Sequence, residues 1–234
     1  MFKPHLEILP QAQLQLWPDL RPAAGLGFVL YGGTAVALRL GHRHSVDFDF
    51  FSEKPLDRDA IQAAFPFIGR SVFLQDERNT LSALVPVAEP EGGQVKVSFF
   101  GMIGFGRVGE PDQTDDGVLQ VASPGDLMAT KVKVIPQRAE AKDYRDIAQM
   151  IKAGVSLAAG LGAARGFFGP NFQPSESLKA LAYFADGDLD TLTYEDKDTL
   201  IRAASAVRDL PNIPIRSRQL ATTQSVPSLR PTQP

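Results

Sequence analysis

Two aspartates, Asp47 and Asp49, stand two residues apart in the segment RHSVDFDFF. The period-two alternation of this segment predicts a strand, with Phe48 and Phe50 on one face and both carboxylates on the other. On a strand their Cα atoms would lie about 6.5 to 7 Å apart. Two unpaired carboxylates this close repel each other, so one keeps its proton unless a cation lies between them. The pair is therefore a candidate site for Mg²⁺ or Mn²⁺, which prefer oxygen ligands and leave positions open for phosphate and water.

Residues just before this strand could hold an anion. Gly32 and Gly33 follow the apolar run LGFVLY at a predicted strand-to-helix turn. Glycine lets the backbone approach a ligand closely there, and the helix N-terminus presents free N–H groups. Thr34 adds a hydroxyl, and Arg43 offers a fork for phosphate. Taken singly, these features have plainer alternatives, namely a tight turn and a half-exposed strand with solvated aspartates. Together, within about 18 residues, they are the elements of a polyphosphate and metal site.

The elements that must position these residues change in character along the chain. The first half predicts a mixed sheet with few helices, because strand candidates recur in GRSVFLQD, TLSALVPV and QVKVSFFG. The glycine-rich GMIGFGRVGEPDQTDDG predicts a long irregular loop before a short strand, VLQVA. From Ser123 onward we expect helices, because SPGDLMATKVKV has a serine N-cap, a proline at the first helical position and an acid at the third. Four further segments predict helices, and internal glycines weaken the second of them: AKDYRDIAQMIKAG, SLAAGLGAARGFFG, SESLKALAYFADG and YEDKDTLIRAASAVRDL.

The composition excludes several kinds of site. The 234 residues include no cysteine, so disulfides and thiolate metal or redox sites are excluded, and any metal must be held by oxygen or nitrogen. The formal net charge of -3 gives no global basic field, so any attraction for nucleic acid must come from a local patch. We find no signal-peptide pattern and no run near the roughly 20 apolar residues of a membrane span, and we therefore expect a cytoplasmic protein without a membrane partner.

Two segments resemble a known family. GGTAVALRLGHRHSVDFDFF resembles the opening motif of the DNA-polymerase-β-like nucleotidyltransferase superfamily, in which a Gly-Gly or Gly-Ser turn precedes a D-x-D strand. Its version with GGTA, GHR and S-x-D-x-D-x-F is similar to the AbiEii/AbiGii group of toxins from type IV toxin-antitoxin and phage-defence systems. A second segment, LMATKVKVIPQRAEAKDYRDI, resembles the downstream pattern of that group, a helix lysine, an arginine and then Lys-Asp-x-x-Asp. The two motifs cover residues 26–52 and 124–151.

The resemblance implies a fold, a reaction and a set of site residues. It implies an α+β protein with the polymerase-β-like mixed sheet and flanking helices, followed by a helical C-terminal region. The implied reaction is transfer of a nucleoside monophosphate from an NTP to an acceptor, with pyrophosphate leaving. Mg²⁺ or Mn²⁺ would be held by Asp47 and Asp49. The residues implied to bind the nucleotide are Gly32, Gly33, Thr34, Arg43 and Ser45. The residues implied to be catalytic are Asp47, Asp49, Lys131, which would neutralise phosphate charge, and Asp143, which would position the acceptor or act as a base.

The acceptor and the partners stay open at this point. The resemblance favours an RNA end such as that of tRNA, or a protein hydroxyl, and it implies a cognate antitoxin. One alternative is a small-molecule transferase, since aminoglycoside nucleotidyltransferases share a Gly-Gly turn and a D-x-D strand. Another is a catalytically inactive descendant that serves as a nucleotide-binding or interaction module.

The second segment also has an interpretation that is independent of the family. In KDYRDIAQMI, Asp143 lies four residues before Ile147, at the edge of a predicted apolar stripe. A carboxylate there is turned away from bulk water and needs a partner. The alternative to a catalytic role is an internal salt bridge with Arg138 or Lys142. The alternative for Lys131 is a solvated lysine on an amphipathic helix.

One position departs from the superfamily pattern. Polymerase-like transferases commonly carry a third carboxylate on a later strand, and the strand QVKVSFFG offers Ser98 at that place. Serine is a poor metal ligand. Three explanations are open: the site works with two acids and one firmly held metal, another acid such as Asp143 completes it, or catalysis has been lost.

These observations predict three parts of the chain. Residues 1–122 would form the nucleotidyltransferase core, and residues 123–210 a helical region that completes the active-site cleft. Residues 211–234 are rich in Pro, Ser, Thr and Gln with few large apolar side chains. Such a segment buries too little surface to order itself, so we expect a tail that is disordered or ordered by a partner.

Overall fold

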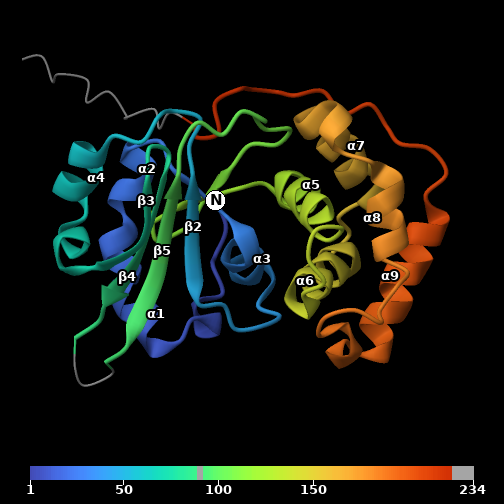
Figure 1. The fold of residues 1–234 in the computed structure, drawn as a ribbon, viewed down its shortest axis with the longest axis horizontal. Coiled ribbons are helices and arrows are strands. Elements are labelled where there is room, and N and C mark those ends of the chain that lie inside the picture. Colours follow the sequence, from blue (N-terminus) through green and yellow to red (C-terminus); the bar gives the residue numbers. More distant parts are fainter. Residues whose placement is uncertain (89–91, 223–234) are drawn as a thin grey trace, which may run out of the picture.

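A mixed seven-stranded sheet forms the centre of the protein in the computed structural model, which describes residues 1–88 and 92–222 (Figure 1). The strands lie in the order β3-β4-β5-β2-β1-β7-β6. β2 pairs antiparallel with β1 and parallel with β5, so the strand that carries the two aspartates lies inside the sheet. The strands are β1 (Val29–Tyr31), β2 (Asp47–Phe51), β3 (Val72–Glu77), β4 (Thr80–Pro86), β5 (Gln94–Phe100), β6 (Asp112–Gln113) and β7 (Gln120–Val121).

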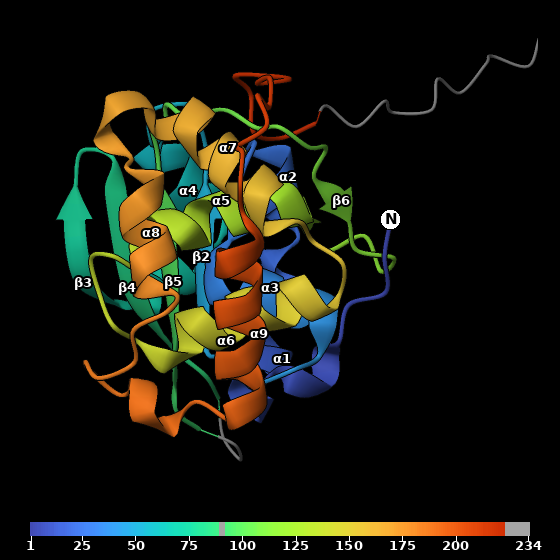
Figure 2. The same cartoon turned by 90° about the vertical axis from the view of Figure 1, so that its right-hand side faces the viewer.

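Helices cover both faces of this sheet, which confirms the predicted α+β class. Figure 1 shows α1, α2 and α4 on one side of the strands and α3, α5 and α6 on the other, with α7, α8 and α9 beyond α5 and α6; Figure 2 shows this outer layer face on. In the described part of the chain, none of the helices has the length and apolar character needed to cross a membrane. The α-helices are α1 (Gln11–Leu16), α2 (Pro22–Gly25), α3 (Gly32–Leu40), α4 (Arg58–Ala64), α5 (Pro124–Val134), α6 (Ala141–Lys152), α7 (Leu157–Phe168), α8 (Pro174–Ala180) and α9 (Tyr194–Ala206). The 3₁₀ helices are Leu6–Ile8, Trp17–Leu20, Pro66–Arg70, Gly169–Asn171 and Leu189–Thr191.

The apolar face of β2 anchors the strand in the core. Phe48 and Phe50 are fully buried. Phe50 stacks on Phe99 of β5 with ring centroids 5.4 Å apart, and Phe48 meets Trp17 at 6.2 Å. Burying each such side chain stabilises the fold by about 1.5 to 3 kcal/mol. The strand is therefore fixed by one face, and its alternation directs the aspartates to the other, as the sequence predicts.

The start of α5 follows its sequence signal. Ser123 accepts a hydrogen bond from the backbone N–H of Asp126, and its hydroxyl donates to the Asp126 carboxylate at 2.6 Å. Pro124 occupies the first helical position, where no intrahelical N–H bond is lost. Because β7 ends at Val121, this capped turn leads directly from the sheet into the helix. The placement of Lys131, two turns further along, follows from it.

The glycines of α7 serve close packing and do not end the helix. A Cβ on Gly160 would overlap the side chain of Met128 on α5, and a Cβ on Gly162 would overlap the carbonyl oxygen of Pro211. α7 therefore approaches a neighbouring helix on one side and the C-terminal segment on another. The cost in helix propensity, about 1 kcal/mol for each glycine, is offset by these contacts.

Residues 211–222 pack against the rest of the protein, unlike the disordered or partner-ordered tail that the sequence predicts. Leu220 is 1% exposed, and the side-chain amide of Gln120 both donates to and accepts from the backbone of Thr222, at 2.8 and 3.0 Å. Arg107 and Ser217 form a β-bridge. The prediction of a tail without its own packing is thus wrong for this stretch, because a few anchors and backbone hydrogen bonds replace the missing apolar residues. Residues 223–234 lie outside the described part of the chain.

Candidate active site

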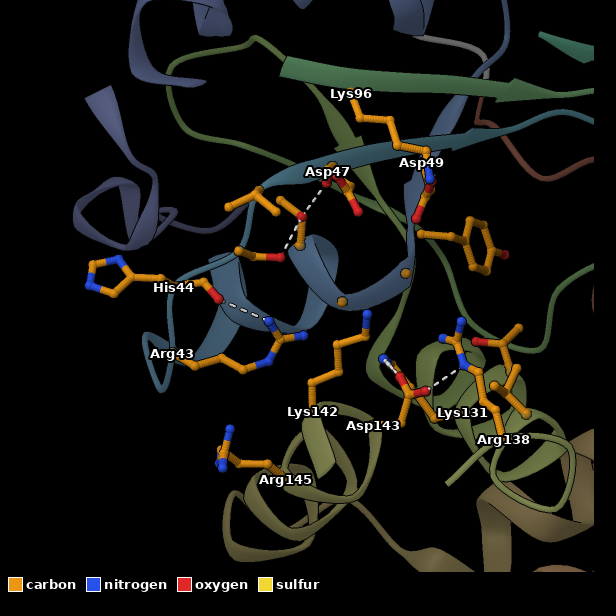
Figure 3. A pocket seen from close by; sticks show the side chains of 18 of the residues that line it. Arg43, His44, Asp47, Asp49, Lys96, Lys131, Arg138, Lys142, Asp143 and Arg145 are labelled. Carbon is orange, nitrogen blue, oxygen red and sulfur yellow. Dashed lines mark hydrogen bonds and ion pairs between the residues drawn. The ribbon is translucent and has the colours of Figure 1, made fainter. Parts of the chain in front are cut away.

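A cavity of about 770 Å³ lies between the sheet and helices α5 and α6. This volume is in the range of small-molecule and cofactor sites. Figure 3 shows Asp47 and Asp49 projecting into it from β2, with Lys131, Asp143 and Arg138 across from them. The structure thus brings all nine predicted site residues to one cavity wall or another: Gly32, Gly33, Thr34, Arg43, Ser45, Asp47, Asp49, Lys131 and Asp143.

The two strand aspartates have no salt-bridge partner among the residues that the structure describes. Burial and the neighbouring charge of Asp47 together raise the pKa of Asp49 above its ordinary value of 3.8. Lys96, on the adjacent strand, opposes this shift without forming a salt bridge. A divalent cation would remove the repulsion that raises the pKa, so the pair fits a hard cation such as Mg²⁺.

In the described part of the chain, no third acid joins Asp47 and Asp49. Within residues 1–88 and 92–222, no group of three or more acidic, histidine or cysteine side chains is placed to hold a metal. The register sets Ser98 directly beside Asp49. Ser98 is 1% exposed, and its hydroxyl accepts a hydrogen bond from Ser82 at 3.1 Å. The position expected for a third carboxylate therefore faces a neighbouring serine, and a metal here would need water or phosphate to complete its coordination.

The two glycines at the start of α3 each leave room for a charged side chain. Gly32 has φ +72°, and a Cβ there would lie 2.7 Å from Oδ2 of Asp49. A Cβ on Gly33 would overlap the guanidinium of Arg43. The side chain of the N-cap residue Tyr31 makes no capping hydrogen bond to the N–H groups of the first turn of α3, and the two glycines of this turn line the cavity. Such groups favour an anion.

Thr34 and Ser45 are buried and bond to each other. Their hydroxyl oxygens lie 2.7 Å apart, and the Thr34 hydroxyl donates to the carbonyl oxygen of Asp47. The link ties the first turn of α3 to the first residue of β2. In this geometry, the two hydroxyls position the aspartate strand relative to the glycine turn.

A buried cluster of charges forms the opposite wall. Nζ of Lys131 lies 2.5 Å from Asp143 and 2.6 Å from Asp146. Arg138 contacts the other oxygen of Asp143 at 2.8 Å, and Arg43 grips Asp146 with two nitrogens at 2.6 and 2.9 Å. Both aspartates are fully buried. The predicted alternative for Asp143, a salt bridge with Arg138, is present, whereas Lys142 pairs with Glu140.

Asp146 is the centre of this cluster. Burial by itself would raise its pKa, but Lys131, His42 and Arg43 lower the pKa far below the ordinary value. His42 Nε2 lies 2.8 Å from the Asp146 carboxylate. Burial likewise opposes the charge on Arg43, and its bonds to Asp146 more than offset this, so the pKa of Arg43 is raised. The guanidinium that the sequence suggests as a phosphate fork is therefore already held by a carboxylate.

Comparison with known proteins gives the family of the chain. The nucleotidyl transferase AbiEii toxin family of type IV toxin-antitoxin systems matches residues 19–206. The chain belongs to this family. The resemblance found in the two sequence motifs is thereby confirmed, and membership in the AbiEii family classes the protein as a nucleotidyltransferase.

Individual proteins that resemble this AbiEii-family chain align with different fractions of its length. An uncharacterized protein from Aquifex aeolicus is 34% identical over 122 residues, which are 51% of this chain and 55% of that protein. A candidate nucleotidyltransferase from H. pylori has a crystal structure that covers 83% of this chain and 93% of its own, with a TM-score of 0.55 and 19% identity. The nucleotidyltransferase toxin MenT4 from Mycobacterium tuberculosis covers 82% of this chain and 86% of its own, with a TM-score of 0.48 and 14% identity. The H. pylori likeness supports the fold.

Sequence reasoning gave no role to several residues in and behind the wall of the cavity. Asp146 is the second aspartate of the Lys-Asp-x-x-Asp motif, but the sequence assigns it no role; its position directly before Ile147 on the buried side of α6 is the signal that it needs a partner. Lys96 and Arg145 line the cavity with no salt bridge in the described part of the chain. Lys96 is brought to the cavity by the pairing of β5 with β2, in which it lies beside Asp47, and this pairing is seen only in the structure. The lining of the cavity contains three aspartates and six lysine or arginine residues. These six are Arg43, Lys96, Lys131, Arg138, Lys142 and Arg145.

Proposed function

We propose that the protein is a Mg²⁺-dependent nucleotidyltransferase that moves a nucleoside monophosphate from an NTP to an RNA end such as that of tRNA, or to a protein hydroxyl. It would act as the toxin of a type IV toxin-antitoxin or phage-defence pair, with a cognate antitoxin as partner. Its substrates would place it in the cytoplasm. The observation that carries the proposal is the unpaired acid pair Asp47 and Asp49, facing a wall rich in cations across one cavity.

Both parts of the chain contribute to this cavity. The strand acids and the glycine turn come from residues 1–122, which we propose as the nucleotidyltransferase core. The cations Lys131 and Arg138 come from the helical region that we propose to end near residue 210. The N–H groups at the start of α3 would hold phosphate oxygens, because the N-terminal end of a helix carries partial positive charge.

Asp47 and Asp49 would hold Mg²⁺, which when bound neutralises charge on the phosphate oxygens. Lys131 lies on the opposite wall and would orient the polyphosphate towards the acids. Both oxygens of Asp143 are engaged, one by Lys131 and one by Arg138. This supports a role for Asp143 in holding those two cations at the cavity in preference to a role as a base.

A transfer assay tests the function and separates it from the alternatives. The protein is incubated with α-labelled NTPs and Mg²⁺, together with total RNA, a protein pool or a pool of small hydroxyl compounds such as aminoglycosides. We expect label on RNA or protein. Label only on small compounds would replace the toxin function with a small-molecule transferase, and NTP binding without transfer would indicate an inactive module, as Ser98 at the third-acid position would allow.

A matched pair of variants tests the site in the same assay. Asp49→Ala removes a proposed metal ligand, and Asp209→Asn changes an exposed carboxylate outside the cavity. We expect Asp49→Ala to abolish transfer and Asp209→Asn to leave it unchanged. Transfer that survives Asp49→Ala would refute the metal site.

A further inference from the structure

The sheet wall of the cavity changes from charged to aromatic along its strands. On β2, alternation puts Asp47, Asp49 and Phe51 on the cavity face in that order. The cavity includes Phe51 and Phe100 as well as the acids. The residues of β5 that pair with the three in register are Lys96, Ser98 and Phe100.

The aromatic end is a supported and partly open surface. The ring of Phe51 stacks on that of Tyr31 at 4.9 Å with 13° between the planes, and Phe100 meets Phe51 edge to face at 5.3 Å. Tyr31 is 1% exposed and supports Phe51 from within, whereas Phe51 and Phe100 are only half-buried. Both rings are thus held in place by packing and still reach the cavity, so their orientation is fixed before any ligand enters.

Helix α5 adds two further residues to the lining of the cavity. Thr130 and Val134 line the same cavity as the two phenylalanines. The Thr130 hydroxyl donates to the carbonyl oxygen of Leu127 one turn back, so its proton is already committed. Lys131 adjoins them on the same helix and points to the charged cluster. The cavity therefore has one end suited to charge and one end suited to a flat apolar group.

We propose that Phe51, Phe100, Thr130 and Val134 form a nucleobase slot that holds the aromatic base of the NTP by stacking. This inference rests on the proposed nucleotidyltransferase function and adds the part of the substrate that lies beyond the phosphates. A nucleotide has the same polarity as the cavity, with a polyanion at one end and a flat heterocycle at the other. Asp49 and Phe51 are two strand residues apart, roughly 7 Å, which leaves room for the ribose between metal and base.

A stacking slot predicts how the protein selects among the bases of the four NTPs. Stacking accepts every base because each has a π-face, and larger rings cover more of the aromatic surface. With the Thr130 hydroxyl already donating to the backbone, this side chain can only accept a hydrogen bond from a base, which limits its discrimination among bases. We expect all four NTPs to bind, with the purine nucleotides ATP and GTP bound more tightly than CTP and UTP.

Calorimetric titration of the full chain with NTPs and with inorganic tripolyphosphate, both with Mg²⁺, tests the slot. Wild-type protein should bind ATP and GTP more tightly than tripolyphosphate. Phe100→Leu, which keeps an apolar side chain but removes the ring, should weaken binding of ATP roughly 10-fold and that of tripolyphosphate less than about twofold. Phe100→Tyr should retain ATP affinity. Phe73→Leu, which removes an exposed ring from the edge strand β3, is the control and should change neither affinity.

Several outcomes would overturn the slot. An ATP affinity no higher than that of tripolyphosphate, or one unaffected by Phe100→Leu, would show that the base lies elsewhere while the polyphosphate site stands. An equal loss of both ligands in Phe100→Leu, or the same ATP loss in Phe100→Tyr, would show that the ring has only a packing role. Binding of neither ligand to wild-type protein would refute the proposed function together with the slot.

Discussion

The two walls of the cleft each carry a pair of closely spaced aspartates, and the surroundings of the two pairs are opposite. Asp47 and Asp49 on β2 have no salt-bridge partner in the part of the chain that the structure describes, and burial with mutual repulsion raises the pKa of Asp49. Asp143 and Asp146 on α6 are fully buried and are contacted by two or more cations each, so the pKa of Asp146 is lowered in spite of burial.

The difference shows how a shared residue type divides into two roles. A buried carboxylate that its own protein leaves unneutralised is destabilised in its charged form and gains most from a cation supplied from outside. A buried carboxylate that is already surrounded by cations has nothing to gain and serves to hold those cations in place. The pattern of partners therefore distinguishes the pair that we propose to bind metal from the pair that holds cations in place (the scaffold pair), where spacing alone does not.

The largest effect is expected from removing charge from the unpaired pair. Asp49→Asn keeps the shape of the side chain but removes a metal ligand, and several kcal/mol of charge stabilisation correspond to a fall in nucleotide transfer of roughly 10³-fold. Transfer of labelled nucleotide measures it, and calorimetric titration with Mg²⁺ should show the affinity falling in parallel. Unchanged Mg²⁺ affinity would assign the metal to other residues.

The second effect concerns the scaffold pair and appears in stability. Asp146→Asn leaves Lys131 and Arg43 without their shared carboxylate, and breaking a buried ion pair from one side costs about 3 to 5 kcal/mol. Urea unfolding measures the loss. The control is Asp198→Asn, which breaks an exposed pair with Arg202 on α9 and should cost less than about 0.5 kcal/mol. Equal costs for the two variants would contradict a scaffold role for Asp146.

The two glycines provide a finer test, because each adjoins a different pair. Gly32→Ala forces a residue with a Cβ into φ +72° beside Asp49, at a cost of about 1 to 3 kcal/mol, and should weaken Mg²⁺ binding. Gly33→Ala displaces Arg43 from Asp146 and should lower stability with less effect on Mg²⁺. Gly25→Ala, with nothing within 4 Å of its Cβ, is the control. Equal effects of the two substitutions on Mg²⁺ affinity would contradict the division.

The smallest effect is expected in the pH dependence of stability, where single carboxylates titrate. Because the pKa of Asp49 is raised, its favourable contribution is full below 3.8 and is lost as pH rises through the raised pKa. Asp49→Asn should therefore stabilise the metal-free protein at neutral pH and lose that advantage in acid. Asp146 has the opposite sign: its contribution is present above 3.8 and is lost as pH falls through the lowered pKa. Urea unfolding of Asp49→Asn and Asp146→Asn between acid and neutral pH measures both contributions. If the free energy of unfolding changed with pH in the same way for the two variants, the opposite pKa shifts would be contradicted.

Much of the site could be predicted because its signals are local. The alternation in DFDFF fixes which side chains share a face, and the serine cap and proline at the start of α5 fix where Lys131 stands in its helix. Asp146, to which the sequence assigns no role, is held by partners that are distant in the sequence. Arg43 meets Asp146 across 103 positions in the sequence, and no local pattern announces that contact.

The C-terminal segment shows why amino-acid composition alone does not predict whether a segment is ordered. Counts of apolar residues indicate how much surface a segment can bury, but not whether a buried side chain elsewhere will hold its backbone. Arg107 and Gln120, both buried, bind the backbone of residues 216–222 and secure a stretch that composition alone would leave unpacked.

Residues 211–222 also form a second connection between the helical layer and the sheet, the two sides of the cleft. The first connection is the short turn from β7 into α5, and the second runs from the groove at Gly162 on α7 to Gln120 and Glu53 beside the sheet. A wide swing of the helical layer would stretch this second tether and break the paired bonds between Gln120 and Thr222. The two connections therefore limit how far the helical layer can move away from the sheet. We expect an acceptor to enter the cavity by a narrow end, and not through a wide opening of the cleft.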